Sequence, residues 1–124
     1  MKMKNYKRFT IDGELADGQS LKAGKDYECE LLIQGANQTG ATITFLAKTA
    51  IDDPDGAAIL TKTGSAVTTT IGTNTLTASF VISGAETENL EGGLALVYGI
   101  QRTLSGKDAV VEEGKLKIEA SVIK

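Results

Sequence analysis

The chain has 124 residues, 41% of them hydrophobic, and a formal net charge of −3. This length fits one domain, and a domain of this size buries roughly two-thirds of the surface of its unfolded chain, which is enough for a core without metal or disulfides. The single cysteine, Cys29, excludes an internal disulfide and favours a reducing compartment. The acidic balance argues against nucleic acid as the main ligand, because proteins that bind it usually carry a basic stripe.

The N-terminal residues and the apolar runs decide the expected compartment. No run approaches the roughly 20 apolar residues that cross a bilayer. Residues 1–8 carry charge but have no apolar stretch behind them, so we expect no signal peptide. We expect synthesis in the cytoplasm and no contact with a membrane. The basic residues of this segment are interpreted as a solvated tail, with a basic arm that docks onto an acidic partner as the alternative.

The first half of the chain alternates apolar and polar residues with the period of two that indicates strands. The first strand ends at the turn signal Asp12-Gly13, and a second signal follows at residues 17–18. Loops are predicted over 35–40 and 52–56, with short strands over 58–61 and 67–71. The residues expected to face inward are Phe9 and Ile11, then Tyr27, Cys29, Leu31 and Ile33, then Ile43, Phe45 and Ala47.

The second half shows the same alternation more clearly. Strands are predicted over 75–82, 94–100 and 115–122, with a turn at 105–108. One short helical turn is predicted over 85–91, with Ser83 as its cap and Gly92-Gly93 as its end. The inward positions are expected to be Leu76, Ala78, Phe80 and Ile82, then Leu94, Leu96, Tyr98 and Ile100, then Leu116, Ile118, Ala120 and Val122.

About seven to nine short strands separated by glycine and aspartate turns predict an all-β domain, either an antiparallel β-sandwich or a small barrel. Each strand has one apolar and one polar face, as two packed antiparallel sheets require. The sequence contains no internal repeat and no low-complexity linker.

The residue types argue against catalysis. The chain has no histidine, which removes Ser-His-Asp and Cys-His arrangements and the usual zinc sites. Cys29 lies in an apolar register and is expected to fill the core. Paired carboxylates could support glycosidase chemistry, but the chain has no tryptophan and only six other aromatic residues to line a sugar cleft. We therefore expect a protein that is not an enzyme and binds no cofactor.

The acidic loop at residues 52–56 raises the question of calcium, because hard cations bind clustered carboxylates. The loop lacks the spacing and terminal glutamate of an EF-hand. A solvated turn without metal is the favoured interpretation, and calcium remains the alternative.

Several segments in order carry a resemblance to a known family. They are TGATITF at 39–45, DDPDGAAIL at 52–60, the hairpin over 67–80, ETENL at 86–90, LALVYGIQ at 94–101, and a closing hairpin over 106–118 with Gly114 at its turn. From Leu21 onward the chain resembles the immunoglobulin-like domain found at the N-terminus of baseplate upper proteins of tailed phages and in related small tail proteins.

The resemblance implies an immunoglobulin-like antiparallel β-sandwich over residues 21–124, preceded by an N-terminal arm or added strand over residues 1–20. It also implies a non-enzymatic virion structural or adaptor protein of the tail, baseplate or head–tail region. Such a protein would assemble with other virion proteins and with itself, as a homo-oligomer. The alternatives are a capsid decoration protein and a β-sandwich module that binds a host surface or carbohydrate.

The expected interaction surface combines the basic arm with the acidic loop. Its residues are Lys4, Lys7, Arg8, Phe9, Asp52, Asp53 and Asp55. Removing residues 1–8 is expected to leave the fold intact and to weaken assembly.

Overall fold

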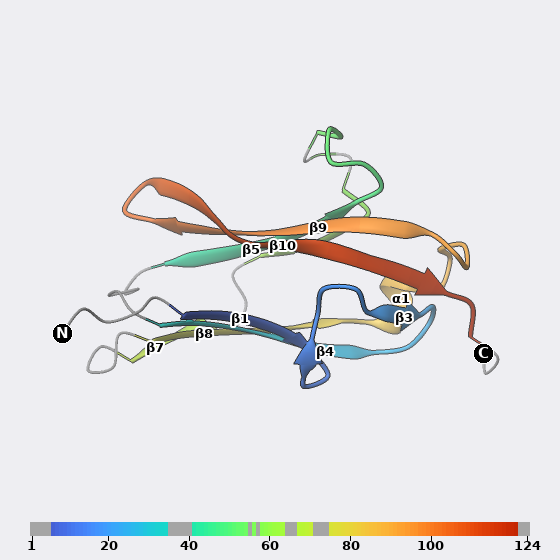
Figure 1. Ribbon diagram of the computed structural model, residues 1–124, viewed down its shortest axis with the longest axis horizontal. Helices are drawn as coiled ribbons and strands as arrows, with labels where there is room; N and C mark the ends of the chain where they lie inside the picture. Colours follow the sequence, from blue (N-terminus) through green and yellow to red (C-terminus); the bar gives the residue numbers. More distant parts are fainter. Residues whose placement is uncertain are drawn as a thin grey trace.

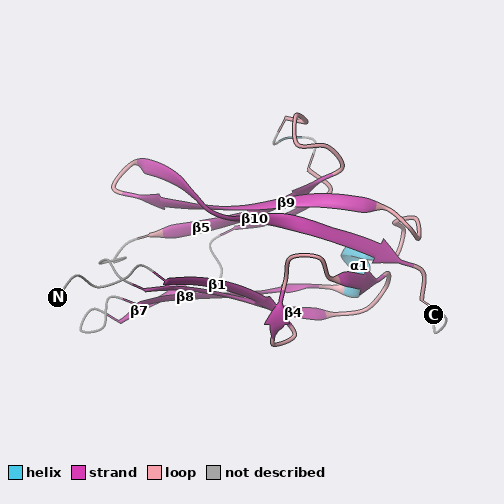
Figure 2. Ribbon diagram, in the orientation of Figure 1, coloured by secondary structure: helices cyan, strands magenta, loops and turns pink. Residues whose placement is uncertain are grey.

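The computed structural model describes residues 6–34, 41–54, 56, 58–63, 67–70 and 75–121. Two β-sheets pack face to face over these residues, with one short helix at one end of the sandwich (Figures 1 and 2). The described elements are β1 (Tyr6–Ile11), β2 (Glu14–Leu15), β3 (Ser20–Lys22), β4 (Tyr27–Gln34), β5 (Thr42–Lys48), β6 (Leu60–Thr63), β7 (Val67–Thr70), β8 (Thr75–Ile82), α1 (Gly84–Thr87), β9 (Ala95–Leu104) and β10 (Lys107–Glu119).

The strand order confirms the predicted immunoglobulin-like β-sandwich. Sheet A has the order β2-β1-β4-β8-β7, and sheet B has the order β3-β10-β9-β5-β6. The run β1-β4-β8-β7 has the A-B-E-D order of an immunoglobulin sheet, and β10-β9-β5-β6 has its G-F-C-C′ order. The described strands exceed the predicted number because β2 and β3 are too short for alternation to reveal them. β3 pairs with β10 in parallel, whereas the other described pairs are antiparallel.

The N-terminal segment belongs to the sandwich from Tyr6 onward. β1 pairs with β4 along its whole length, from Tyr6 opposite Gln34 to Ile11 opposite Cys29. Deleting residues 1–8 would therefore remove the first half of a paired strand, which corrects the expectation that the fold is independent of this segment. The predicted turn at Asp12-Gly13 is confirmed, since both residues have the positive φ angles, 51° and 81°, of a type I′ hairpin.

Four aromatic rings join the two sheets at the centre of the core. Phe9 of β1 and Phe80 of β8 meet Phe45 of β5 and Tyr98 of β9, with ring centroids 5.2 to 5.9 Å apart. Ring pairs at this separation each add about 0.5–1.5 kcal/mol beyond the burial of their area. The Phe9 side chain is only 2% exposed. This burial corrects the expectation that Phe9 contributes to an exposed interaction surface.

The C-terminal half differs from expectation at Gly114. This residue was predicted to mark a turn, but it lies within the continuous strand β10, directly opposite Tyr98. A Cβ atom at Gly114 would lie 2.6 Å from the Tyr98 hydroxyl oxygen and 2.7 Å from Asp17 Oδ1. The glycine is thus required by the close approach of the Tyr98 ring. Ala120 is exposed, contrary to expectation, and Val122 lies outside the described residues.

The short helix α1 confirms the predicted helical turn, although it ends at Thr87 instead of residue 91. The Glu86 carboxylate accepts the backbone N–H of Ser83 at 3.0 Å, which closes the first turn. The Asp26 carboxylate accepts the backbone N–H of Gly84 at 2.7 Å and ties the helix to the chain before β4. The described part of the chain holds no helix with the length and apolar character of a membrane span.

Candidate functional site

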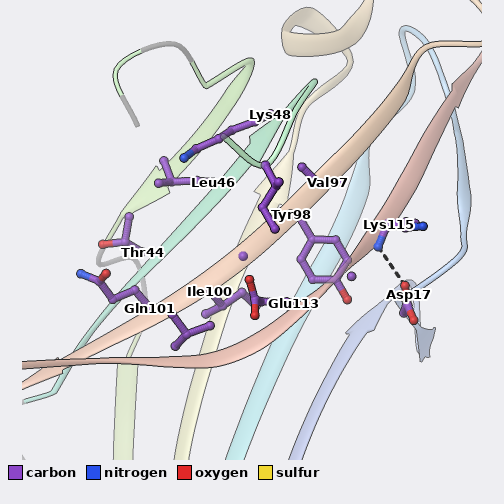
Figure 3. Close-up of a pocket in the computed structure, with 14 residues that line it drawn as sticks. Asp17, Thr44, Leu46, Lys48, Val97, Tyr98, Ile100, Gln101, Glu113 and Lys115 are labelled. Carbon is purple, nitrogen blue, oxygen red and sulfur yellow. Dashed lines mark hydrogen bonds between the residues drawn. The ribbon is translucent and has the colours of Figure 1, made fainter. Parts of the chain in front are cut away.

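The outer face of sheet B carries an open hollow of about 630 Å³, which we call the trough. Its floor is formed by outward-facing side chains of β5 and β9, and its sides include residues of β10 and the connection after β5 (Figure 3). The strand register orders the floor in three rows, which are Lys48–Val97–Lys115, Leu46–Gly99–Glu113 and Thr44–Gln101–Val110.

Gly99 leaves the centre of the trough floor open, because the middle row has no side chain there. A glycine inside a central strand costs about 0.5–1 kcal/mol relative to alanine. Nothing in the described part of the chain requires it, since Gly99 is absent from the positive-φ glycines and a Cβ atom there would meet nothing within 4 Å. Glycine in a strand interior often marks a place where a ligand or another backbone approaches closely.

Two projecting segments wall the trough at its ends. The connection after β5 and the hairpin between β9 and β10 both rise on the outer side of sheet B (Figure 1). The first carries Ile51, which is 71% exposed, and the second carries Val110, which is 60% exposed. A register shift between Val110 and Glu112 accompanies the bend of the hairpin. Both side chains border the hollow, so a partner that fills it would also remove them from water.

Two charged side chains of the trough, those of Lys48 and Asp17, are held by hydrogen bonds to the backbone. The Lys48 ammonium donates to the backbone carbonyl of Asp53 at 2.8 Å, which fixes the wall that carries Ile51. On the other side, the Asp17 carboxylate accepts the backbone N–H of Lys115 at 2.8 Å (Figure 3). Lysines therefore stand at both ends of the Val97 row, whereas Glu113 stands at the end of the Gly99 row.

Burial raises the pKa values of two potential nucleophiles, Tyr98 and Cys29. Tyr98 lies beneath the trough, where burial, with smaller contributions from Glu112 and Asp17, raises the pKa of its hydroxyl well above its ordinary value. The hydroxyl therefore stays protonated. The chain's thiol, Cys29, lies on β4 in the other sheet, and burial raises its pKa to about 12. Neither group is available as an anionic nucleophile near neutral pH.

The residues predicted for interaction are divided between the two sheets. Lys7 and Arg8 are exposed on β1 of sheet A. Asp52 and Asp53 lie in the connection beside the trough, where Asp53 also accepts the Thr49 hydroxyl at 3.0 Å. Lys4 and Asp55 lie outside the described residues. Among the described residues no cluster of three or more acidic or thiol groups could hold a metal. Asp55 lies outside them, so the solvated turn without metal stays a prediction for the full loop and calcium stays its alternative.

The trough was not predictable from the sequence, because most of its residues come from three strands whose order was unknown. Gly99 was assigned only as a member of the strand over 94–100. The one available signal was a glycine in the middle of a strongly apolar strand, without a neighbouring turn residue.

Comparisons with known proteins give no family for this chain. No family model and no curated protein matches the sequence. Among solved structures, a β-glucosidase from Listeria innocua in complex with isofagomine is similar at 11% identity and a TM-score of 0.48. The match covers 94% of this chain but 16% of the β-glucosidase chain. A likeness at this level carries no conclusion about activity.

Proposed function

We propose that this protein is a non-enzymatic structural or adaptor protein of a tailed-phage virion, and that it works through protein–protein assembly at the trough. The supporting observation is Gly99, a glycine that the fold does not need at the centre of an exposed sheet face. A partner that touches the backbone there would account for it. The partners would be other virion proteins and further copies of this chain.

The shape and chemistry of the trough support a protein partner. Its floor combines apolar side chains from Leu46 and Val97 with polar ones from Thr44 and Gln101. Protein interfaces typically have such an apolar centre surrounded by polar groups. The projecting Ile51 and Val110 could each fill a recess of the partner, and their burial there would contribute to binding by removing apolar surface from water.

The aromatic side chains argue against a carbohydrate-binding module. Phe9, Phe45, Phe80 and Tyr98 are buried in the core. Tyr27 is half-buried, and its hydroxyl accepts the backbone N–H of Lys22 at 2.6 Å. Among the aromatic residues whose side chains are described, none is exposed as a platform for a sugar ring.

The proposed function is tested by incorporation into particles. Particles are purified on a density gradient from cells that express the wild-type chain, Gly99→Leu or Gly56→Leu, and the chain in them is quantified by mass spectrometry. Gly56 is the matched control, because its added Cβ also meets nothing within 4 Å and it does not line the trough. We expect wild type and Gly56→Leu in the particles and Gly99→Leu reduced about tenfold or more. Particles without the wild-type chain would contradict the proposal, as would equal incorporation of all three.

A further inference from the structure

We propose that the trough receives the turn between β1 and β2 of a second copy of this chain, so that copies stack head to tail. The inference rests on the proposed function in that it takes the trough to be a protein-binding surface. The inserted part would be the β1–β2 tip, which we define as residues 12–15. This tip has the sequence Asp-Gly-Glu-Leu.

The β1–β2 tip presents a hydrophobic side chain to water. Leu15 is 65% exposed, although it lies on a strand that belongs to sheet A. The turn projects from sheet A on the side away from sheet B, as the blue loop below the sandwich in Figure 1 shows. The trough opens on the outer side of sheet B. The tip and the trough therefore face in opposite directions.

The tip is held rigidly. The Gln19 side-chain amide donates to the backbone carbonyls of Ile11, Glu14 and Leu15 at 3.1, 3.0 and 2.9 Å. The Asp12 carboxylate accepts the backbone N–H of Glu28 at 2.8 Å and fixes the other side of the turn. A loop whose backbone is ordered before association loses less conformational entropy on binding. The tip thus has the preorganisation expected of an inserted element.

The exposed apolar side chains of the two surfaces complement each other. The three most exposed large hydrophobic residues in the described part of the chain are Ile51, Leu15 and Val110. Two of them wall the trough and the third is on the tip, so one contact between copies would cover all three. Gly99 supplies the space at the floor where Leu15 would lie.

The charges favour one register of this contact. The tip carries two carboxylates, Asp12 and Glu14, and the trough has lysines at both ends of the Val97 row. Glu113 in the Gly99 row would repel the same carboxylates, and so would Asp17, whose carboxylate lies against the backbone N–H of Lys115 at the outer end of the Val97 row. The acidic side chains are therefore placed over the Val97 row, between Lys48 and Lys115.

The contact joins different surfaces of the two copies. Each bound pair would keep one free tip and one free trough, which allows a further copy to add at either end. Such an interface produces a ring where the rotation between copies closes and an open stack where it does not.

The test uses the full-length chain and light scattering over a concentration series. We expect the wild-type mass to rise above that of one chain, and Leu15→Asp and Gly99→Leu each to weaken association about tenfold or more. Two matched controls, Ile59→Asp at another exposed apolar residue and Gly56→Leu, are expected to associate like wild type. Circular dichroism and urea unfolding verify that all variants remain folded.

An equimolar mixture of Leu15→Asp and Gly99→Leu gives the decisive result. The first variant keeps an intact trough and the second keeps an intact tip, so the mixture should form a dimer that cannot grow. A mixture that remains monomeric while wild type associates would overturn the head-to-tail arrangement. Charge reversal gives a second check, since Lys115→Glu should weaken association and Lys115→Glu combined with Glu14→Lys should restore it.

The two proposals can fail separately. A wild-type chain that stays monomeric over the whole series overturns the inference, even when Gly99→Leu is lost from particles and the proposed function stands. Head-to-tail association of a chain that is absent from particles would leave the inference in place and overturn the proposed function.

Discussion

Replacing Gly99 with threonine should stabilise the folded chain. The new Cβ atom would meet nothing within 4 Å, so this atom brings no steric penalty, and the γ atoms extend toward the open trough. The backbone at this position does not have a positive φ angle and therefore accepts a β-branched residue. Replacing a glycine in a strand interior with alanine raises the free energy of unfolding by about 0.5–1 kcal/mol. Threonine is favoured over alanine on pleated surfaces.

We therefore expect the free energy of unfolding to rise by about 1 kcal/mol. For a domain of this size the midpoint of thermal unfolding should rise by about 4 °C. The measurement is urea unfolding followed by circular dichroism at the lowest usable protein concentration, because association would stabilise the wild type by mass action. The Leu15→Asp chain provides the same comparison without self-association.

A loss of stability at Gly99→Thr would refute the reasoning about the trough. It would mean that the fold itself requires glycine at this position. The hollow would then follow from packing within the chain, and no partner would be needed to explain it. A gain in stability together with a loss of assembly would show that the glycine serves binding at the expense of the monomer.

Three further predictions concern the corner around α1 and the buried thiol. Gly84→Ala should lower the free energy of unfolding, measured in urea, by about 1–3 kcal/mol. The added Cβ atom would lie 2.7 Å from the carbonyl carbon of Gly24 and 3.3 Å from the amide nitrogen of Lys25, which are backbone atoms. A stability like that of Gly56→Ala would contradict this prediction. Cys29, whose pKa is raised to about 12, should resist a thiol reagent in mildly alkaline buffer and react only when the chain is unfolded in urea. Rapid labelling of the folded chain would contradict this prediction. Burial raises the pKa of Glu86, but hydrogen bonds from Lys62 and Ser83 outweigh it and leave the pKa below its ordinary value of 4.5. The stabilising contribution of Glu86 should thus be present above pH 4.5 and be lost as the pH falls through its folded-state pKa. In urea unfolding at a series of pH values, Glu86→Gln should therefore show a smaller loss of stability toward acid than the wild type. Parallel wild-type and variant curves would contradict this prediction.

The inward faces of the strands could be predicted from the sequence because burial on one side imposes a period of two. Leu76, Ala78, Phe80 and Ile82 of β8 are all buried, as their alternation predicts. The turn at Asp12-Gly13 was predictable for a similar local reason, since only a few residue types accept two positive φ angles in succession.

Features that depend on a partner strand were not predictable. Gly114 has the appearance of a turn residue, and its true role depends on the Tyr98 ring that β9 places over it. The trough depends on the register of β5, β9 and β10, which brings Leu46 and Glu113 to the two sides of Gly99. A period of two specifies which face a residue occupies but not which strand lies beside it.

The parallel pair between β3 and β10 bears on how the chain folds. It joins Ser20–Lys22 to Lys117–Glu119, so strands near the two ends of the sequence must meet before sheet B is complete. Proteins dominated by such distant pairings have high contact order and fold in milliseconds to seconds, because much of the loop entropy is lost before the contacts form. During synthesis, sheet A can assemble from β1, β4 and β8, but its apolar face stays uncovered until β9 and β10 have been synthesised. Until those strands leave the ribosome, the nascent chain exposes aggregation-prone surface, and this interval is when a chaperone would have most effect.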